Sequence, residues 1–189
     1  MARPRSGDKK KAILDAALRI CAERGIGGAP TSAISKAAGI AEGSLFTYFK
    51  TKDELLTELY TTLRREFSQH LPDFPHGQAP RTRLRYVWDR FLDLGAQNPE
   101  QLKVLAQLRA SGRLYRENET PNFALAELVK ATGEAVQGTK LSAVPPEFLV
   151  LMIRSQAEIT VEFIRVHPES AELCREMGFK MLWDGLTGN

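Results

Sequence analysis

The side chains best suited to binding an anion are concentrated in the first 52 residues. This segment holds ten Lys and Arg residues against four Asp and Glu, whereas the rest of the chain holds 16 against 19. Lys and Arg beside a phosphate backbone release condensed counterions, so such a charge distribution favours contact with a polyanion. A solvated basic face is the alternative interpretation of the same charges.

Residues that could build a catalytic or metal site are sparse. His70, His76 and His167 lie at a helix end, in a linker and beside a proline, without a nucleophile elbow, phosphate loop or metal pair. Cys21 and Cys174 lie far apart and outside any Cys/His cluster, which favours buried thiols over a zinc site or disulfide framework. A redox role is the alternative for the cysteines. We expect no enzyme, no cofactor and no metal.

The overall composition is that of a globular protein. Of 189 residues, 43% are hydrophobic and 26% are charged. The longest apolar run, 148–153, is six residues long, whereas about 20 are needed to cross a bilayer. No apolar segment follows the basic N-terminus, so we expect no secretion signal. We expect a cytoplasmic protein that does not interact with membranes.

The elements that must position the basic residues are helices. Apolar residues recur at three- and four-residue intervals between glycine and proline breakers, and no segment alternates as a strand does. The pattern predicts an all-α chain with nine helices, at about 9–24, 31–38, 42–49, 51–70, 81–97, 99–112, 120–137, 146–166 and 169–186.

Local signals place the ends and the buried face of the early helices. Thr31 or Ser32 is the expected N-cap of the second helix, and Thr51 with Glu54 has the spacing of a capping box. Apolar residues four apart would anchor the third helix on a small core. The expected core positions are Ile13, Ala17, Ile34, Ala37, Leu45 and Phe49.

The block from Ile13 to Leu55 resembles the DNA-binding domain of the tetracycline-repressor (TetR) family. The matching pieces are Ile13-Leu14-x-Ala16-Ala17, Gly25, Ile34-x-x-Ala37-Ala38-Gly39-Ile40, Gly43-Ser44-Leu45-Phe46-x-Tyr48-Phe49 and Lys52-x-x-Leu55. The resemblance implies a helix-turn-helix domain over 1–52, extending into the fourth helix to about 70, and a helical regulatory and dimerisation domain over 53–189.

The function that this resemblance implies is transcriptional regulation. Such a protein would be a repressor that binds a palindromic operator as a homodimer, and a small apolar effector would release it from the operator. A DNA-binding regulator that senses no ligand, acting constitutively or architecturally, is the alternative.

A recognition helix enters the major groove with its N-terminal part foremost. The expected base readers are Ser44, Phe46 and Thr47, and Gly43 would let the backbone approach the groove closely. Glu42 could accept a hydrogen bond from a cytosine amine, or could simply favour the helix N-terminus. Phosphate contacts are expected from Thr31, Ser32, Lys36, Tyr48 and Lys52, and from the N-terminal arm through Arg3 and Arg5.

The eighth and ninth helices carry more apolar residues than one buried face requires. By resemblance they form a four-helix dimer interface with a second copy, which would include Ile159, Leu173, Met177 and Met181. The family's apolar ligand cavity would be lined by Leu59, Tyr60, Leu63, Trp88, Phe91, Leu105, Leu108, Arg109, Phe123, Met152, Gln156 and Phe163. Ordinary core packing is the alternative for most of these positions.

Overall fold

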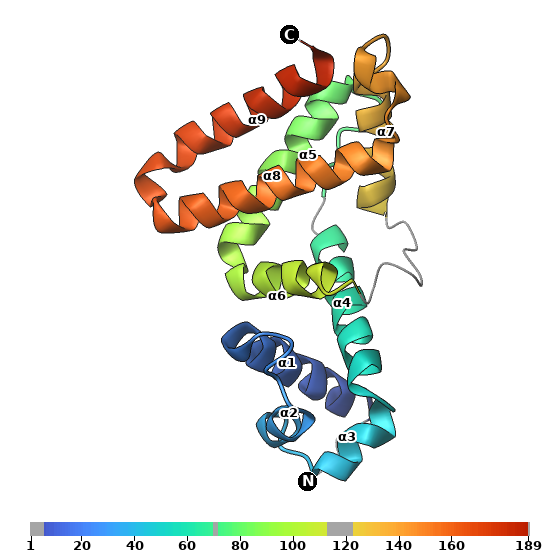
Figure 1. The fold of residues 1–189 in the computed structure, drawn as a ribbon, viewed down its shortest axis with the longest axis vertical. Coiled ribbons are helices and arrows are strands. Elements are labelled where there is room, and N and C mark those ends of the chain that lie inside the picture. Colours follow the sequence, from blue (N-terminus) through green and yellow to red (C-terminus); the bar gives the residue numbers. More distant parts are fainter. Residues whose placement is uncertain (1–5, 70–71, 113–122, 189) are drawn as a thin grey trace. The chain divides into compact units, whose positions relative to one another are not determined.

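A computed structural model describes residues 6–69, 72–112 and 123–188 and confirms the all-α prediction (Figure 1). The described residues form nine α-helices and two short 3-10 helices, and they contain no strand. The α-helices are α1 (Ser6–Arg24), α2 (Thr31–Ala37), α3 (Glu42–Tyr48), α4 (Lys52–Gln69), α5 (Pro80–Gln97), α6 (Pro99–Ala110), α7 (Phe123–Ala135), α8 (Pro146–Val166) and α9 (Ala171–Thr187).

The helix boundaries follow the glycines and prolines. Pro80, Pro99 and Pro146 each stand at the first position of a helix, where proline's missing N–H costs nothing. The 3-10 helices Lys140–Ala143 and Pro168–Ser170 precede α8 and α9 and were not expected from the sequence pattern. Their three- and four-residue lengths are too short to produce a recognisable period. No helix among the described residues is long and apolar enough to pass through a bilayer.

The chain divides into two compact units. Unit 1 contains residues 1–66 and 99–119, and unit 2 contains residues 67–98 and 120–189. Unit 1 thus combines α1 to α3, most of α4 and α6, whereas unit 2 holds α5, α7, α8 and α9. In this division α6 lies with the N-terminal helices.

The core of unit 1 is small and almost fully closed. Ile13, Ala17, Ile34, Leu45 and Phe49 are each at most 2% exposed, as the sequence pattern predicts. The sixth expected position, Ala37, is wrong, because this residue is exposed at the end of a seven-residue helix that buries only Ile34 and Ser35.

Helix α6 packs against α1 within unit 1. The Lys103 ammonium donates to the Ala22 carbonyl at 2.8 Å, in the last turn of α1, where a cation compensates the helix dipole. The Gln107 side-chain oxygen accepts from the Ile26 N–H at 3.3 Å. These two contacts hold the segment that leads into α2.

Unit 2 is a bundle in which α5 contacts α7, α8 and α9. Its interior contains Leu84, Trp88, Leu92, Phe179 and Leu182. Helices α8 and α9 form a helical hairpin, visible in orange and red in Figure 1. Helices α8 and α9 each bury one apolar side in the bundle, and apolar residues on their other sides are exposed to solvent in the described chain.

A buried cation joins α5 to α7. Arg83 is 4% exposed, and its guanidinium pairs with Glu134 and lies 3.8 Å from Glu127. Its Nε also donates to the Gln78 carbonyl at 3.0 Å. A charge so far from water is tolerated only when it is paired and hydrogen-bonded, as it is here.

Candidate nucleic-acid interface

The α2–α3 pair has the geometry of a helix-turn-helix. Gly39 adopts a φ of 68° in the turn, a left-handed conformation that glycine takes without strain. Helix α3 then begins after the extended residue Ala41, and it buries Leu45 alone of its seven residues. The remaining surface of α3 is available to a partner.

Side chains of two kinds are exposed on α3 beside the buried Leu45. Ser44 and Thr47 are exposed hydroxyls, and Phe46 is an exposed aromatic ring at 44% of its full accessibility. A Cβ built on Gly43 would meet nothing within 4 Å. The predicted base readers therefore share one exposed surface, which includes donors, acceptors and an apolar group that can contact a thymine methyl.

Glu42 has a partner within the protein. The Thr31 hydroxyl donates to the Glu42 carboxylate at 2.9 Å, which links the first residues of α2 and α3. Neither Thr31 nor Ser32 is the N-cap of α2, because Pro30 occupies that position and no side chain caps it. The N-cap prediction is therefore wrong, and Thr31 instead ties the two helices together.

The lysines predicted to contact phosphate differ in their surroundings. Lys36 is exposed on α2, whereas Lys52 is half-buried and its ammonium donates to the Ile26 carbonyl at 2.9 Å. Tyr48 is half-buried and Ser32 is exposed. Arg3 and Arg5 lie outside the described residues. Lys52 thus fastens the start of α4 to the α1–α2 loop, a contact that the spacing of the sequence does not predict.

A capping box stabilises the start of α4, directly after α3. The Glu54 N–H donates to the Thr51 hydroxyl at 3.0 Å, and the Lys50 N–H donates to the Glu54 carboxylate at 2.7 Å. The second bond reaches one residue before the N-cap instead of the N-cap itself. This box orients α3 relative to the long helix α4.

The residues predicted to line a ligand cavity fall into both units. In unit 1, Leu59, Tyr60, Leu63, Leu105 and Leu108 are buried and Arg109 is half-buried; in unit 2, Trp88 is buried and Phe91 and Gln156 are half-buried. The side chain of Phe123 lies outside the described residues.

Met152 and Phe163 lie elsewhere than the cavity prediction implies. They are 58% and 47% exposed and line an open groove of about 820 Å³ between α8 and α9. Three residues predicted for the dimer interface, Ile159, Met177 and Met181, line the same groove. Met152, Ile159 and Phe163 on α8 and Met177 and Met181 on α9 are thus exposed side chains of one groove.

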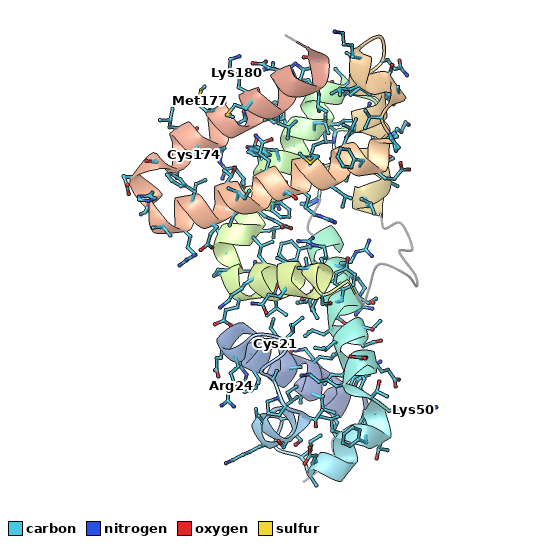
Figure 2. All side chains as sticks on the ribbon, viewed as in Figure 1. Cys21, Arg24, Lys50, Cys174, Met177 and Lys180 are labelled. Carbon is cyan, nitrogen blue, oxygen red and sulfur yellow. The ribbon has the colours of Figure 1, made fainter. Side chains whose placement is uncertain are left out.

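This exposed surface is here termed the α8–α9 apolar face. It consists of the large apolar side chains that the described part of unit 2 leaves in solvent, namely Phe148, Met152, Ile159, Phe163, Val166, Leu173, Met177 and Met181. Cys174 lines the adjoining groove, and Figure 2 shows it beside Met177 on α9. Six of these eight side chains, all except Val166 and Leu173, line one groove, and exposed apolar side chains gathered in this way are typical of an interaction site.

The two thiols have different surroundings. Cys21 is fully buried in α1, and this burial raises the pKa of its thiol. Cys174 is half-buried. Burial favours the protonated, unreactive form of Cys21, in agreement with a structural role for that residue. Among the described residues no group of His, Cys, Asp or Glu is arranged to hold a metal ion.

Comparison with known proteins connects this arrangement to a family. Residues 13–59 match the family model of "Bacterial regulatory proteins, tetR family". This segment contains the helix-turn-helix and the capping box. A fatty acid metabolism regulator protein of Bacillus subtilis is 30% identical over 97 residues, which cover 51% of this chain and 50% of the relative. The chain spans between a quarter and about half of the length of these curated relatives.

Solved structures agree over nearly the whole fold. A putative tetR family transcription regulator from Shewanella has a TM-score of 0.74 at 23% identity, with 94% of this chain and 97% of that chain covered. The regulator FadR from Bacillus subtilis, solved in complex with stearoyl-CoA, has a TM-score of 0.65 at 21% identity, with 93% and 98% covered. These relatives are transcriptional regulators and not enzymes. Residues 13–59 are thus similar to the DNA-binding segment of the tetR family of bacterial regulatory proteins, and the chain shares the fold of solved tetR family regulators.

Proposed function

We propose that the protein is a transcriptional repressor that binds a palindromic operator as a homodimer, with α3 in the major groove. The observation that carries the proposal is the exposed row of Gly43, Ser44, Phe46 and Thr47 above the fully buried Leu45. One side of α3 is anchored and the other offers groups that distinguish base pairs. Lys36 on the neighbouring α2 is exposed and would contact phosphate.

The test compares a base reader with a phosphate contact. We expect Thr47→Ala to change base preference, with a loss of roughly fivefold or more in discrimination at one position. Lys36→Ala should weaken binding to every sequence alike and lower the slope of log affinity against log salt by about one. Selection from a random duplex library, followed by titration at several salt concentrations, measures both effects. Unchanged base preference and salt slope in both variants would contradict the assignment of α2 and α3.

The partner on the α8–α9 apolar face is, in this proposal, a second copy of the chain. Two recognition helices about one DNA turn apart read a palindrome, so a symmetric dimer suits the function. Because the face is apolar and uncovered in the described chain, its burial against an identical face would release water without leaving charges unpaired.

An apolar small molecule is proposed as the signal that releases the operator. The name of the fatty acid metabolism regulator and the stearoyl-CoA complex of FadR suggest fatty acyl compounds as the first probes. Helix α4 supports a coupling route, because it starts at the capping box beside α3 and its last residues belong to unit 2. A regulator that senses no ligand remains the alternative function.

Reciprocity makes the effector proposal testable with one probe. Allosteric couplings are typically about 1–3 kcal/mol, so stearoyl-CoA should weaken operator binding by roughly 5- to 150-fold. Operator duplex must then weaken stearoyl-CoA binding by the same factor. Titration calorimetry with and without the duplex measures this. Equal affinities would exclude stearoyl-CoA as an inducer, and the same result across a panel of acyl chain lengths would favour the ligand-free alternative.

A further inference from the structure

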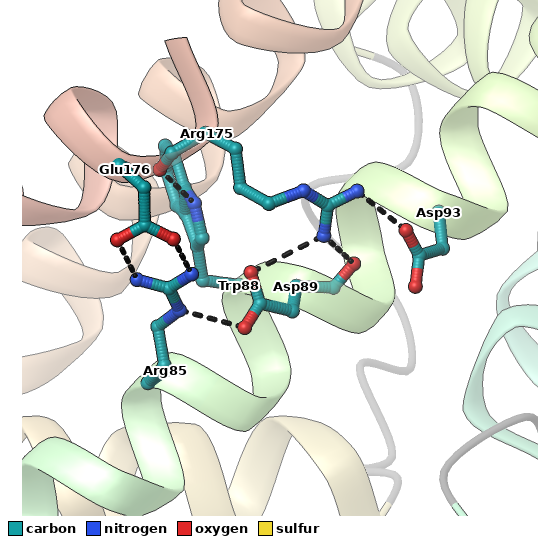
Figure 3. Close-up of polar contacts among 6 residues, drawn as sticks. All are labelled: Arg85, Trp88, Asp89, Asp93, Arg175 and Glu176. Atoms are coloured by element: carbon teal, nitrogen blue, oxygen red, sulfur yellow. Dashed lines mark hydrogen bonds and ion pairs between the residues drawn. The ribbon is translucent and has the colours of Figure 1, made fainter. Parts of the chain in front are cut away.

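The contact between α5 and α9 is built from ion pairs and hydrogen bonds instead of apolar packing alone (Figure 3). The Arg85 guanidinium donates hydrogen bonds to the Glu176 carboxylate from both Nη1 and Nη2, and the Nη1 hydrogen bond is 2.8 Å long. Arg175 donates from Nη2 to the Asp93 carboxylate at 2.5 Å and from Nη1 to the Asp89 carboxylate at 3.2 Å. We call Arg85, Trp88, Asp89, Asp93, Arg175 and Glu176 the α5–α9 polar cluster.

The cluster also fixes how closely the two helices approach. The Trp88 indole N–H donates to the Arg175 carbonyl at 3.0 Å. One turn further, a Cβ at Gly178 would lie 2.7 Å from the Trp88 ring, so only glycine fits there without displacement. From the other side, the Gln156 amide of α8 donates to the Gly178 carbonyl at 2.8 Å. Helix α9 is therefore held by directional contacts to both neighbours.

The side of α9 that points away from α5 carries part of the α8–α9 apolar face. Leu173, Met177 and Met181 stand four residues apart and are 66%, 45% and 67% exposed. Glu176 and Gly178 flank Met177 in the sequence, on the same rigid helix. A rotation or slide of α9 that broke the contacts to α5 would move all three apolar side chains by the same amount.

We propose that the α5–α9 polar cluster positions α9 and thereby sets the geometry of the apolar face that binds a second copy of the chain. The inference rests on the proposed homodimer. Apolar contact is non-directional and tolerates sliding, whereas a bidentate Arg–carboxylate pair fixes both distance and orientation. The apolar face supplies the attraction, and the polar cluster behind it supplies the register of the dimer and the separation of its two recognition helices.

Two conservative substitutions in full-length protein test the role of the bidentate pair. Arg85→Lys and Glu176→Gln keep the size of each side chain but lose the paired geometry. Each should weaken dimerisation by roughly tenfold in sedimentation equilibrium, a cost of ~1.4 kcal/mol. The double variant should lose little more than the worse single variant, because both changes remove one interaction. Lys180→Gln is the matched control, since Lys180 pairs with Asp184 within α9 and not with α5.

The preferred spacing of the operator half-sites is a second measurement, because general destabilisation of the fold would not change which spacing is bound best. Wild type should bind one spacing best, and the cluster variants should accept spacings one base pair longer or shorter with less discrimination. Wild-type dimerisation should also weaken as NaCl rises from 0.1 to 1 M, because salt screens the half-exposed pair, whereas apolar association alone does not weaken with salt.

The outcomes separate this inference from the proposed function. A wild-type protein that is monomeric at micromolar concentration would overturn the homodimer, and the positioning role would fall with it. A wild-type dimer whose affinity does not weaken with salt, or whose folded cluster variants keep its affinity and spacing preference, would overturn the positioning role alone. Weaker, salt-dependent dimerisation with relaxed spacing in the variants, and unchanged behaviour in Lys180→Gln, is the result that we expect.

Discussion

Ile159→Lys should convert the protein into a monomer that folds normally and no longer holds its operator tightly. Ile159 is 71% exposed in the single chain, so a lysine there has free access to water and costs the monomer little. In a dimer joined through the α8–α9 apolar face, the same ammonium would be buried without a partner. The two half-sites would then be bound separately, and operator affinity should fall by about 10²- to 10⁴-fold because avidity is lost.

Mass measurement and thiol reactivity check this expectation together. The variant should have monomeric mass at micromolar concentration, and its Cys174 should react with a thiol reagent faster than in wild type, where the partner would cover the groove that Cys174 lines. Cys21 is fully buried and serves as the internal control that stays unreactive in both proteins.

Gln137→Lys supplies the matched control for the added charge. Gln137 is an exposed residue of unit 2 that does not line the groove. It should leave mass, thiol reactivity and operator affinity unchanged. A dimeric Ile159→Lys variant with wild-type operator affinity would show that a second copy does not use this face.

Local chemistry explains why the helices and the core of unit 1 could be predicted from the sequence. Proline and glycine act on their own residue and its neighbours, so their positions mark the ends of α1, α5, α6 and α8 without tertiary information. Leu45 and Phe49 repeat at the helical period, and both are buried as expected. Thr51 and Glu54 form their capping box within a single turn.

The contacts that could not be predicted join residues far apart in the chain. Arg85 and Glu176 are 91 residues apart, and Lys103 reaches Ala22 across 81. A charged residue on a helix surface has the same local pattern whether it faces solvent or a partner helix. Lys52 illustrates this, because its half-buried ammonium donates to a backbone carbonyl, although its place beside the proposed recognition helix suggests a phosphate contact.

The same reasoning explains the changed interpretation of Met152 and Phe163. The sequence shows that α8 has apolar residues on more than one side, but it does not show which side meets α5 and which is left uncovered. In the structure Leu149, Ile153 and Ala157 take the buried side, so Met152 and Phe163 fall on the exposed one. Packing against a helix distant in sequence makes this choice.

Gly43→Leu should leave the fold intact and strongly weaken operator binding. Gly43 is exposed near the start of α3, and a Cβ placed on it meets nothing within 4 Å. Leucine is also a better helix former than glycine, by up to about 1 kcal/mol, so the thermal midpoint should stay the same or rise. Within the described residues, neither a positive φ nor a contact at the Cβ position requires glycine here.

A bound operator would require it, because the proposed docking brings the α3 backbone close to the base edges. Forcing a side chain into such a packed contact costs roughly 1–3 kcal/mol, and a dimer has the substitution twice. Operator affinity should therefore fall by roughly 30- to 10⁴-fold. Gly43→Ala, with one methyl group, should have an intermediate affinity.

Ala110→Leu provides the control for an added leucine, because Ala110 is exposed at the end of α6 in the same unit and lies outside the proposed DNA-binding surface. Fluorescence anisotropy with the selected operator measures all three variants. If affinity follows the size of the side chain at residue 43 while stability does not fall, the cost arises in the complex and α3 lies against DNA at Gly43. Wild-type affinity in a folded Gly43→Leu variant would instead place the recognition surface elsewhere on unit 1, because a leucine cannot be accommodated between α3 and the floor of the groove.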